Sequence, residues 1–199
     1  MSGVRNICVY CGSSSGNSPA YAETADRMGA ALAQAGIGLV FGGGSQGLMG
    51  RIARAVLTGG GRVTGIIPHF LDEQEVGMKE ATELHVVQDM HTRKRLMFEK
   101  ADAFLALPGG IGTLEELTEQ LTLMRIGRHT KPLVLLDVNG YWRPLLALFA
   151  HMRHSGFVSR GYEAHYQVAE RVEDVIPIIL AAASRARSSE AEKTLLERL

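Results

Sequence analysis

Three glycine-rich loops, each placed directly after a short apolar run, constrain the fold of this 199-residue chain more than any other feature. The loops are residues 11–16, 42–47 and 107–113. Stretches with helical periodicity follow them, so that short strands and helices alternate along the chain. This alternation predicts an α/β fold with a parallel sheet and helices on both faces. Because ligands bind outside the carboxyl ends of the strands in such folds, we expect the three loops to meet at one edge, around a nucleotide-like ligand.

The apolar runs and the periodic stretches between them predict the order of the elements. Strands are expected at residues 6–10, 36–41, 62–67, 83–87, 103–107, 132–137 and 166–169. Helices are expected at residues 19–35, 48–57, 90–100, 113–126, 141–154 and 173–183, with a loop or short helix at 69–82. We expect residues 1–183 to form a single nucleotide-binding domain. The polar residues 184–199 are expected to be a tail that is either frayed or helical, with Leu195, Leu196 and Leu199 against a partner.

Composition excludes several classes of protein. The 21 basic and 21 acidic residues balance, which leaves no electrostatic footprint for nucleic acid. No apolar stretch approaches the roughly 20 residues of a membrane span, and no signal-peptide pattern follows Met1. We therefore expect a cytoplasmic protein with neither nucleic acid nor membrane as partner. Cys8 and Cys11 have no second Cys/His pair with zinc-ligand spacing and should point to opposite faces of a strand, so we expect buried thiols and no metal site.

The third loop carries the densest chemistry, since residues 107–116 read LPGGIGTLEE. Glycines at the start of a helix let backbone N–H groups turn toward an anion, and the helix dipole favours that anion. Glu115 and Glu116 follow at once, and Glu119 shares a helix face with Glu115 and either lines the pocket or is solvated. A second interpretation is a capping box, with Thr113 as N-cap and Glu116 reaching back to it. From helical geometry, Glu116 is as suitable for a cap as for a catalyst.

Two common nucleotide-binding motifs are disfavoured. Gly42, Gly44 and Gly47 satisfy G-x-G-x-x-G between a strand and a helix, which raises an NAD(P) reductase as a candidate. That motif needs an acidic residue about 20 positions later to hold the ribose, and the corresponding residues 66–69 read IIPH. A G-K-[ST] phosphate-binding motif is absent from every glycine-rich loop, which disfavours a P-loop NTPase.

A basic cluster opens the helix expected at residues 90–100, where the sequence reads MHTRKR. Cations are unfavourable at a helix N-terminus, because the dipole there is positive. We therefore expect the cluster to meet an anion, either a ligand phosphate or the pair of Glu115 and Glu116. The alternative is a solvated basic turn.

Four of these stretches together resemble the LOG family, the cytokinin riboside 5′-monophosphate phosphoribohydrolases long mislabelled as lysine decarboxylases. They are PGGIGTLEE at 108–116, GGGSQGLMG at 42–50, MHTRK at 90–94 and CGSS at 11–14. The resemblance runs in order from about Asn6 to Val175. It implies a Rossmann-like, three-layer, doubly wound parallel sheet in a homodimer. It also implies hydrolysis of the N-glycosidic bond of an adenine-type nucleoside 5′-monophosphate to free base and ribose 5-phosphate, with no cofactor or metal.

The resemblance assigns roles to residues by position. Arg93 and Glu116 fall on the catalytic pair. The remaining residues would bind the substrate, with the 5′-phosphate held by the glycine loop. These substrate-binding positions are Gly109, Gly110, Ile111, Gly112, Thr113, Glu115, Lys94, Glu75, Thr122, Ser13 and Gly44.

Glycosidic cleavage develops positive, oxocarbenium-like charge on the ribose. A carboxylate at Glu116 would either stabilise that charge or activate the attacking water. Arg93 would orient Glu116 and the ribose. One departure is Leu123, where family members commonly have tryptophan, and it leaves the preference between N6-prenylated adenine and plain AMP open. A nucleotide-binding or molybdenum-cofactor carrier without turnover, built on the same scaffold, is the alternative function.

Overall fold

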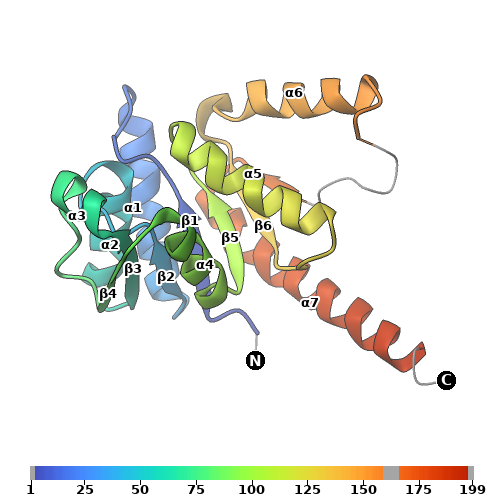
Figure 1. Ribbon diagram of the computed structural model, residues 1–199, viewed down its shortest axis with the longest axis horizontal. Helices are drawn as coiled ribbons and strands as arrows, with labels where there is room; N and C mark the ends of the chain where they lie inside the picture. Colours follow the sequence, from blue (N-terminus) through green and yellow to red (C-terminus); the bar gives the residue numbers. More distant parts are fainter. Residues whose placement is uncertain (1–2, 159–165, 197–199) are drawn as a thin grey trace.

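The computed structural model describes residues 3–158 and 166–196 and, within these ranges, leaves out the side chains of residues 73–75 and 189–196. Seven strands of the described chain form one sheet in the order β4-β3-β2-β1-β5-β6-β7, and every neighbouring pair is parallel (Figure 1). The strands are β1 (Asn6–Tyr10), β2 (Gly38–Phe41), β3 (Val63–Pro68), β4 (Glu83–Val87), β5 (Ala103–Ala106), β6 (Leu133–Leu136) and β7 (Tyr166–Ala169). The predicted α/β class with a parallel sheet is confirmed, and the expected strand boundaries lie within two residues of those observed.

Helices connect the strands, as the alternating pattern predicted. They are α1 (Pro19–Gln34), α2 (Gly47–Thr58), α3 (His69–Glu75), α4 (Met90–Lys100), α5 (Ile111–Arg125), the 3-10 turn η1 (Val138–Gly140), α6 (Arg143–His154) and α7 (Val172–Leu196). The expected boundary at residue 183 falls inside α7, which continues to Leu196. None of the described helices is both long and apolar enough to cross a membrane.

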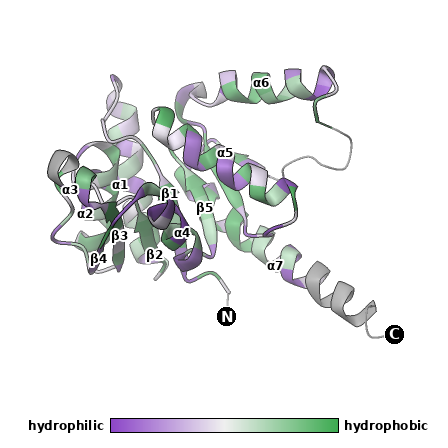
Figure 2. Ribbon diagram, in the orientation of Figure 1, coloured by the Kyte–Doolittle hydropathy of each residue, from purple (hydrophilic) through white to green (hydrophobic). Residues whose placement is uncertain are grey.

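The sheet is buried on both faces, which gives three layers. Alternate side chains of β1 enter different cores: Ile7 and Val9 pack with α1, α2 and α7, whereas Cys8 and Tyr10 pack with α4 and α5. A parallel sheet covered in this way needs apolar residues on both sides of its strands, which is why β1 and β5 appear green in Figure 2. Cys11 belongs to the first core, so the two free thiols lie on opposite faces as expected, and burial raises the pKa of both.

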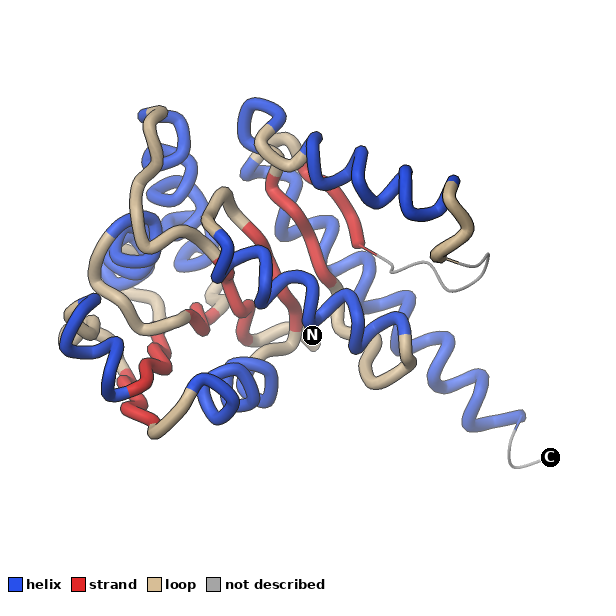
Figure 3. Tube along the Cα trace, turned by 45° about the horizontal axis from the view of Figure 1, so that its top comes forward, coloured by secondary structure: helices blue, strands red, loops and turns tan. Residues whose placement is uncertain are grey.

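The strand order reverses at β1, which lies between β2 and β5. Connections therefore leave β1 and β5 in opposite directions, and in folds of this kind ligands bind at such a reversal, outside the carboxyl ends of the strands. At this edge, which comes forward in Figure 3, the Gly12 N–H donates to the Pro108 carbonyl at 3.1 Å and the Gly12 carbonyl accepts from the Leu48 N–H at 3.0 Å. Gly12 thus joins the loops that follow β1, β2 and β5. Their predicted meeting at one edge is confirmed.

Close backbone approach explains two of the glycines in these loops. Gly47 has φ +56°, and a Cβ atom there would lie 2.3 Å from the Ser13 carbonyl carbon. A Cβ atom on Gly42 would lie 2.0 Å from Nη2 of Arg93. A side chain at either position would separate the loop after β2 from its neighbours, so these glycines hold the edge together.

Candidate active site

The N-terminus of α5 presents a cluster of backbone donors at this edge of the sheet. The helix begins at Ile111, with Gly110 as an N-cap that makes no side-chain capping bond, and its first turn holds no acidic residue. Within the described chain, no protein group accepts a hydrogen bond from the N–H of Gly110, Ile111, Gly112 or Thr113. Four free donors at the positive end of a helix dipole form an anion-binding seat.

The predicted capping box is wrong. Because α5 begins at Ile111, Thr113 is the third helical residue and not the N-cap, and Glu116 is the sixth. At that position Glu116 is one full turn beyond the free N–H groups and cannot serve as their cap. The predicted N-cap at Thr113 is wrong because Gly110 serves as N-cap without a side-chain bond, so the helix begins before Thr113.

Glu116 is a buried carboxyl group, with only 9% of the residue exposed. Burial raises its pKa from 4.5 to about 7, and the negative charge of Glu115 adds to the rise, while the nearby cations Arg93 and Lys94 oppose it. A carboxyl group tuned to neutral pH, at the edge where ligands bind, is typical of an acid–base or charge-stabilising catalyst. Stability alone does not favour it, since an ionised carboxylate at this depth loses hydration.

Arg93 is also buried, at 6% exposed, and backbone carbonyls hold it in place. Its Nε donates to the Ile66 carbonyl at 3.2 Å, and its Nη2 donates to the Gly42 carbonyl at 2.9 Å. The guanidinium therefore fastens the ends of β2 and β3 together and contributes its charge to the surroundings of Glu116. The interpretation of the basic cluster as a solvated turn is wrong for this residue.

Lys94 joins α4 to α5 by two ion pairs. Its Nζ lies 2.6 Å from Glu115 and 3.1 Å from Glu119, and its side chain is 18% exposed. The hydrogen bond to Glu115 is the main reason that the pKa of Lys94 is raised. One of the anions expected for the basic cluster, Glu115, is thus found, and Glu119 is paired and not merely solvated.

The remaining predicted residues are placed at different distances from the seat. Ser13 lies in the loop after β1, against Gly47, and the Gly44 backbone pairs with Gly77 in the loop after α3. Thr122 is exposed and donates to the Thr118 carbonyl of its own helix at 2.8 Å. It lies about 13 Å along α5 from Thr113, at ~1.5 Å per residue, so the structure does not bring it to the phosphate seat.

Glu75 ends α3, and its side chain lies outside the described part of the structure. The backbone next to it is fixed at the site, because the Val76 carbonyl accepts from the Ser45 N–H at 3.1 Å. Val76 has φ +50°, a conformation that β-branched residues rarely adopt. Strain of this kind persists only where the surroundings impose it, so the turn after Glu75 is held against the loop after β2.

Two residues at the site were not singled out from the sequence. Asp89 is the N-cap of α4, accepting from the Thr92 N–H at 2.7 Å, and the Asp89-x-x-Thr92 spacing is a signal that was available. The Tyr141 hydroxyl donates to the Gly109 carbonyl of the phosphate loop. No sequence signal points to this contact, since 32 residues separate the partners. Trp142, the next residue, is buried in the core beneath α4 and α5.

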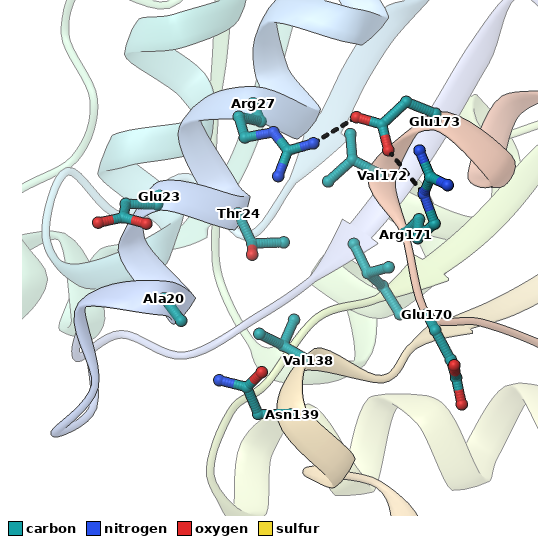
Figure 4. Close-up of a pocket in the computed structure, with 11 residues that line it drawn as sticks. Ala20, Glu23, Thr24, Arg27, Val138, Asn139, Glu170, Arg171, Val172 and Glu173 are labelled. Carbon is teal, nitrogen blue, oxygen red and sulfur yellow. Dashed lines mark hydrogen bonds and ion pairs between the residues drawn. The ribbon is translucent and has the colours of Figure 1, made fainter.

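A hollow of about 300 Å³ lies away from this seat, between α1, η1 and the start of α7 (Figure 4). Arg27 and Arg171 both pair with Glu173 at its wall, which Glu23 and Glu170 also line. None of the predicted site residues lines it. Among the described residues, no cluster of three His, Cys, Asp or Glu side chains is arranged to hold a metal ion.

Comparison with known proteins identifies the family. A family described as "Possible lysine decarboxylase" matches residues 49–179, more than half of the chain. A cytokinin riboside 5′-monophosphate phosphoribohydrolase of Rhodococcoides fascians is 44% identical over 176 residues, which cover 88% of this chain and 89% of that protein. The chain belongs to the LOG family. The phosphoribohydrolase LOG7 of Arabidopsis thaliana is 48% identical to this LOG protein over 155 residues, 78% of this chain and 71% of the relative.

Solved structures share the fold of this LOG protein at lower identity. The Moco carrier protein of Chlamydomonas reinhardtii is 20% identical with a TM-score of 0.69, over 92% of this chain and 99% of that one. The molybdenum cofactor binding protein of Rippkaea orientalis is 20% identical with a TM-score of 0.66, over 89% and 96% of the two chains. Likeness at this identity establishes a common scaffold, and the scaffold alone does not decide the activity.

Proposed function

We propose that this protein hydrolyses the N-glycosidic bond of adenine-type nucleoside 5′-monophosphates, including cytokinin riboside 5′-monophosphates, and releases free base and ribose 5-phosphate. Family membership and the names of the relatives support this activity. The observation that carries it is the position of Glu116, a buried carboxyl group one helical turn beyond four free N–H donors. That separation suits a nucleotide whose phosphate binds at the helix end while its ribose extends over the carboxylate.

The phosphate provides binding energy remote from the bond that breaks. Held by the N–H groups of residues 110–113, the 5′-phosphate anchors the ribose and reduces the freedom of the sugar at the reacting carbon. Binding energy from such a remote group contributes to catalysis by fixing the orientation of the substrate. Lys94 fixes Glu115 beside the loop and offsets part of the negative charge of Glu115 and Glu119 there.

Cleavage breaks the bond between C1′ of the ribose and the base nitrogen. The electron pair leaves with the base, which takes up a proton, and water adds its oxygen to C1′ and loses a proton. Ionised Glu116 suits either of two roles in this step: it stabilises the positive charge at C1′, or it accepts the proton of the water. Both require the carboxylate form. The pKa of about 7 therefore predicts an activity that rises with pH through neutrality.

Arg93 is proposed as the second member of the catalytic pair. Its charge opposes the rise in the pKa of Glu116 and so keeps part of the carboxyl population ionised at neutral pH. Bonds to two backbone carbonyls fix the guanidinium, which therefore acts without rearranging during the reaction.

We also propose that the protein acts in the cytoplasm as a homodimer. Exposed apolar side chains support the dimer: α6 has no buried residue and lies beyond α5 in Figure 1, and Leu148 and Phe157 are 47% and 83% exposed. A second copy of the chain is the simplest cover for such a surface. Light scattering coupled to size-exclusion chromatography measures the mass directly, and a monomer at micromolar concentration refutes the dimer.

The activity is tested by incubating the protein with isopentenyladenosine 5′-monophosphate and, separately, with AMP. Chromatography then measures free base and ribose 5-phosphate. Release of both products from either nucleotide is expected, and the ratio of the two rates reveals the preferred base, which Leu123 leaves open. Tight nucleotide binding by calorimetry without any free base would refute the hydrolase and favour a carrier on the same scaffold.

A further inference from the structure

Tyr141 reaches the phosphate loop from a separate part of the fold. It follows the turn η1 after β6, and its hydroxyl donates to the carbonyl of Gly109. Its ring makes edge-type contacts with two aromatic neighbours, with ring centroids 5.7 Å from Tyr21 and 5.0 Å from Trp142. These two ring contacts restrict the positions that the hydroxyl can take.

The turn that carries Tyr141 is itself fixed. Buried Asp137 accepts from the Trp142 N–H at 2.7 Å, and the Tyr141 N–H donates to the Val138 carbonyl at 3.1 Å. Asn139 takes the left-handed conformation, φ +54°, that closes the turn. The hydroxyl is therefore held on a rigid support that does not belong to the phosphate loop.

The geometry of one peptide unit gives this contact its consequence. The Gly109 carbonyl and the Gly110 N–H belong to the same trans peptide plane, so they point in opposite directions. Two adjacent glycines would let this plane rotate, because neither residue restricts its backbone dihedrals. A Cβ atom on Gly109 would lie 2.1 Å from Oγ1 of Thr113, whereas one on Gly110 would meet nothing within 4 Å, so packing leaves the Gly110 side of the plane open. The bond from Tyr141 fixes it, with the carbonyl toward Tyr141 and the N–H directed away.

We propose that Tyr141 is a positioning residue for phosphate binding: its hydroxyl bond to the Gly109 carbonyl directs the Gly110 N–H toward the 5′-phosphate of the substrate. The inference rests on the proposed function for the identity of the ligand. It predicts that the hydroxyl matters only for ligands that carry the phosphate. The base and the glycosidic bond are not affected by its removal.

Tyr141→Phe removes the hydroxyl and keeps the ring. The dissociation constants of ribose 5-phosphate and of inorganic phosphate, measured by calorimetry, are expected to rise about three- to tenfold, the effect of one lost hydrogen bond. KM for AMP should rise by a similar factor with kcat little changed, and slow cleavage of adenosine, which lacks the phosphate, should be unaltered. Tyr166→Phe, which removes a hydroxyl from a β7 residue whose ring lies 5.7 Å from Phe149 of α6, is the matched control and should change none of these values.

Three results would overturn the proposal. Unchanged phosphate and ribose 5-phosphate affinities in Tyr141→Phe would show that the hydroxyl does not orient the donor. An equal loss of activity on AMP and adenosine would assign Tyr141 a merely structural role. Phosphate titration of the unaltered protein gives an independent test by amide NMR: the Gly110 resonance should shift with phosphate, and a resonance that stays in place refutes the proposal even if the variant does not fold. Absence of hydrolysis in the unaltered protein refutes the proposed function. The calorimetric and NMR measurements with phosphate do not depend on hydrolysis, so they still test the role of Tyr141.

Discussion

Replacing Glu116 by glutamine should abolish activity and stabilise the fold at alkaline pH, and both effects follow from the burial of one carboxyl group. Glutamine has nearly the same shape as protonated glutamate, so the packing around residue 116 is preserved. The ionised form is lost, and with it the charge that we propose acts on the ribose or on water. We expect kcat for AMP to fall by about 10²- to 10⁴-fold, the contribution typical of a positioned acid or base.

The stability change can be worked out from the pKa. In the unfolded chain the carboxyl group ionises near 4.5, whereas in the folded protein it ionises near 7. Below pH 4.5 the group is protonated in both states and contributes no difference. Between pH 4.5 and 7 the folded state binds more protons than the unfolded state, so the free energy of unfolding falls as pH rises. Above pH 7 the full penalty is present, about 3 kcal/mol at ~1.4 kcal/mol per tenfold change in the acid constant.

Urea denaturation of both proteins at pH 4.5 and at pH 8 measures this difference. Glu116→Gln should match the unaltered protein at the acidic pH and exceed it by about 3 kcal/mol at pH 8. Glu99→Gln, an exposed carboxylate on α4 that lies 4.0 Å from Arg95, is the control and should stay within about 0.5 kcal/mol at both values. A stability difference for Glu116→Gln that does not change with pH would refute the reasoning, since it would mean that the carboxyl group has an ordinary pKa in the folded protein.

Three other substitutions test the surroundings of Glu116. Arg93→Met leaves two buried carbonyls without a donor, so urea denaturation should show the free energy of unfolding reduced by about 2–4 kcal/mol. The pKa of Glu116 should also rise further, and a pH–rate profile that does not move to higher pH contradicts the role assigned to Arg93. Gly109→Ala places a Cβ atom 2.1 Å from Oγ1 of Thr113, and calorimetry should find phosphate affinity reduced by about tenfold or more, because the loop must move. Lys94→Met breaks the two ion pairs between α4 and α5. We expect KM for AMP to rise severalfold, while thermal unfolding shows a stability loss of about 1 kcal/mol or less. An unchanged KM would mean that Lys94 only joins the two helices.

The glycine loops and the basic cluster illustrate how far the sequence predicted the site. Local pattern was enough for the seven strands and for the meeting of the loops, because the carboxyl ends of parallel strands share an edge. It was not enough for the start of α5, where the sequence offered Thr113 as a cap and the chain used Gly110. Helix ends depend on which backbone groups have partners in the folded protein, and the neighbouring loops determine those partners.

Hydrophobic periodicity and the positions of glycine were sufficient to predict the order of the elements, the α/β class and the residue types gathered at the carboxyl edge. The burial of Glu116 near the charge of Arg93, its position beyond the helix cap and the contact of Tyr141 with Gly109 became visible in the folded structure alone. The physical reason is the same in each case. A pKa shift arises from lost hydration and from charges brought close by the fold, and a hydrogen bond between residues 32 positions apart exists only after the sheet has formed.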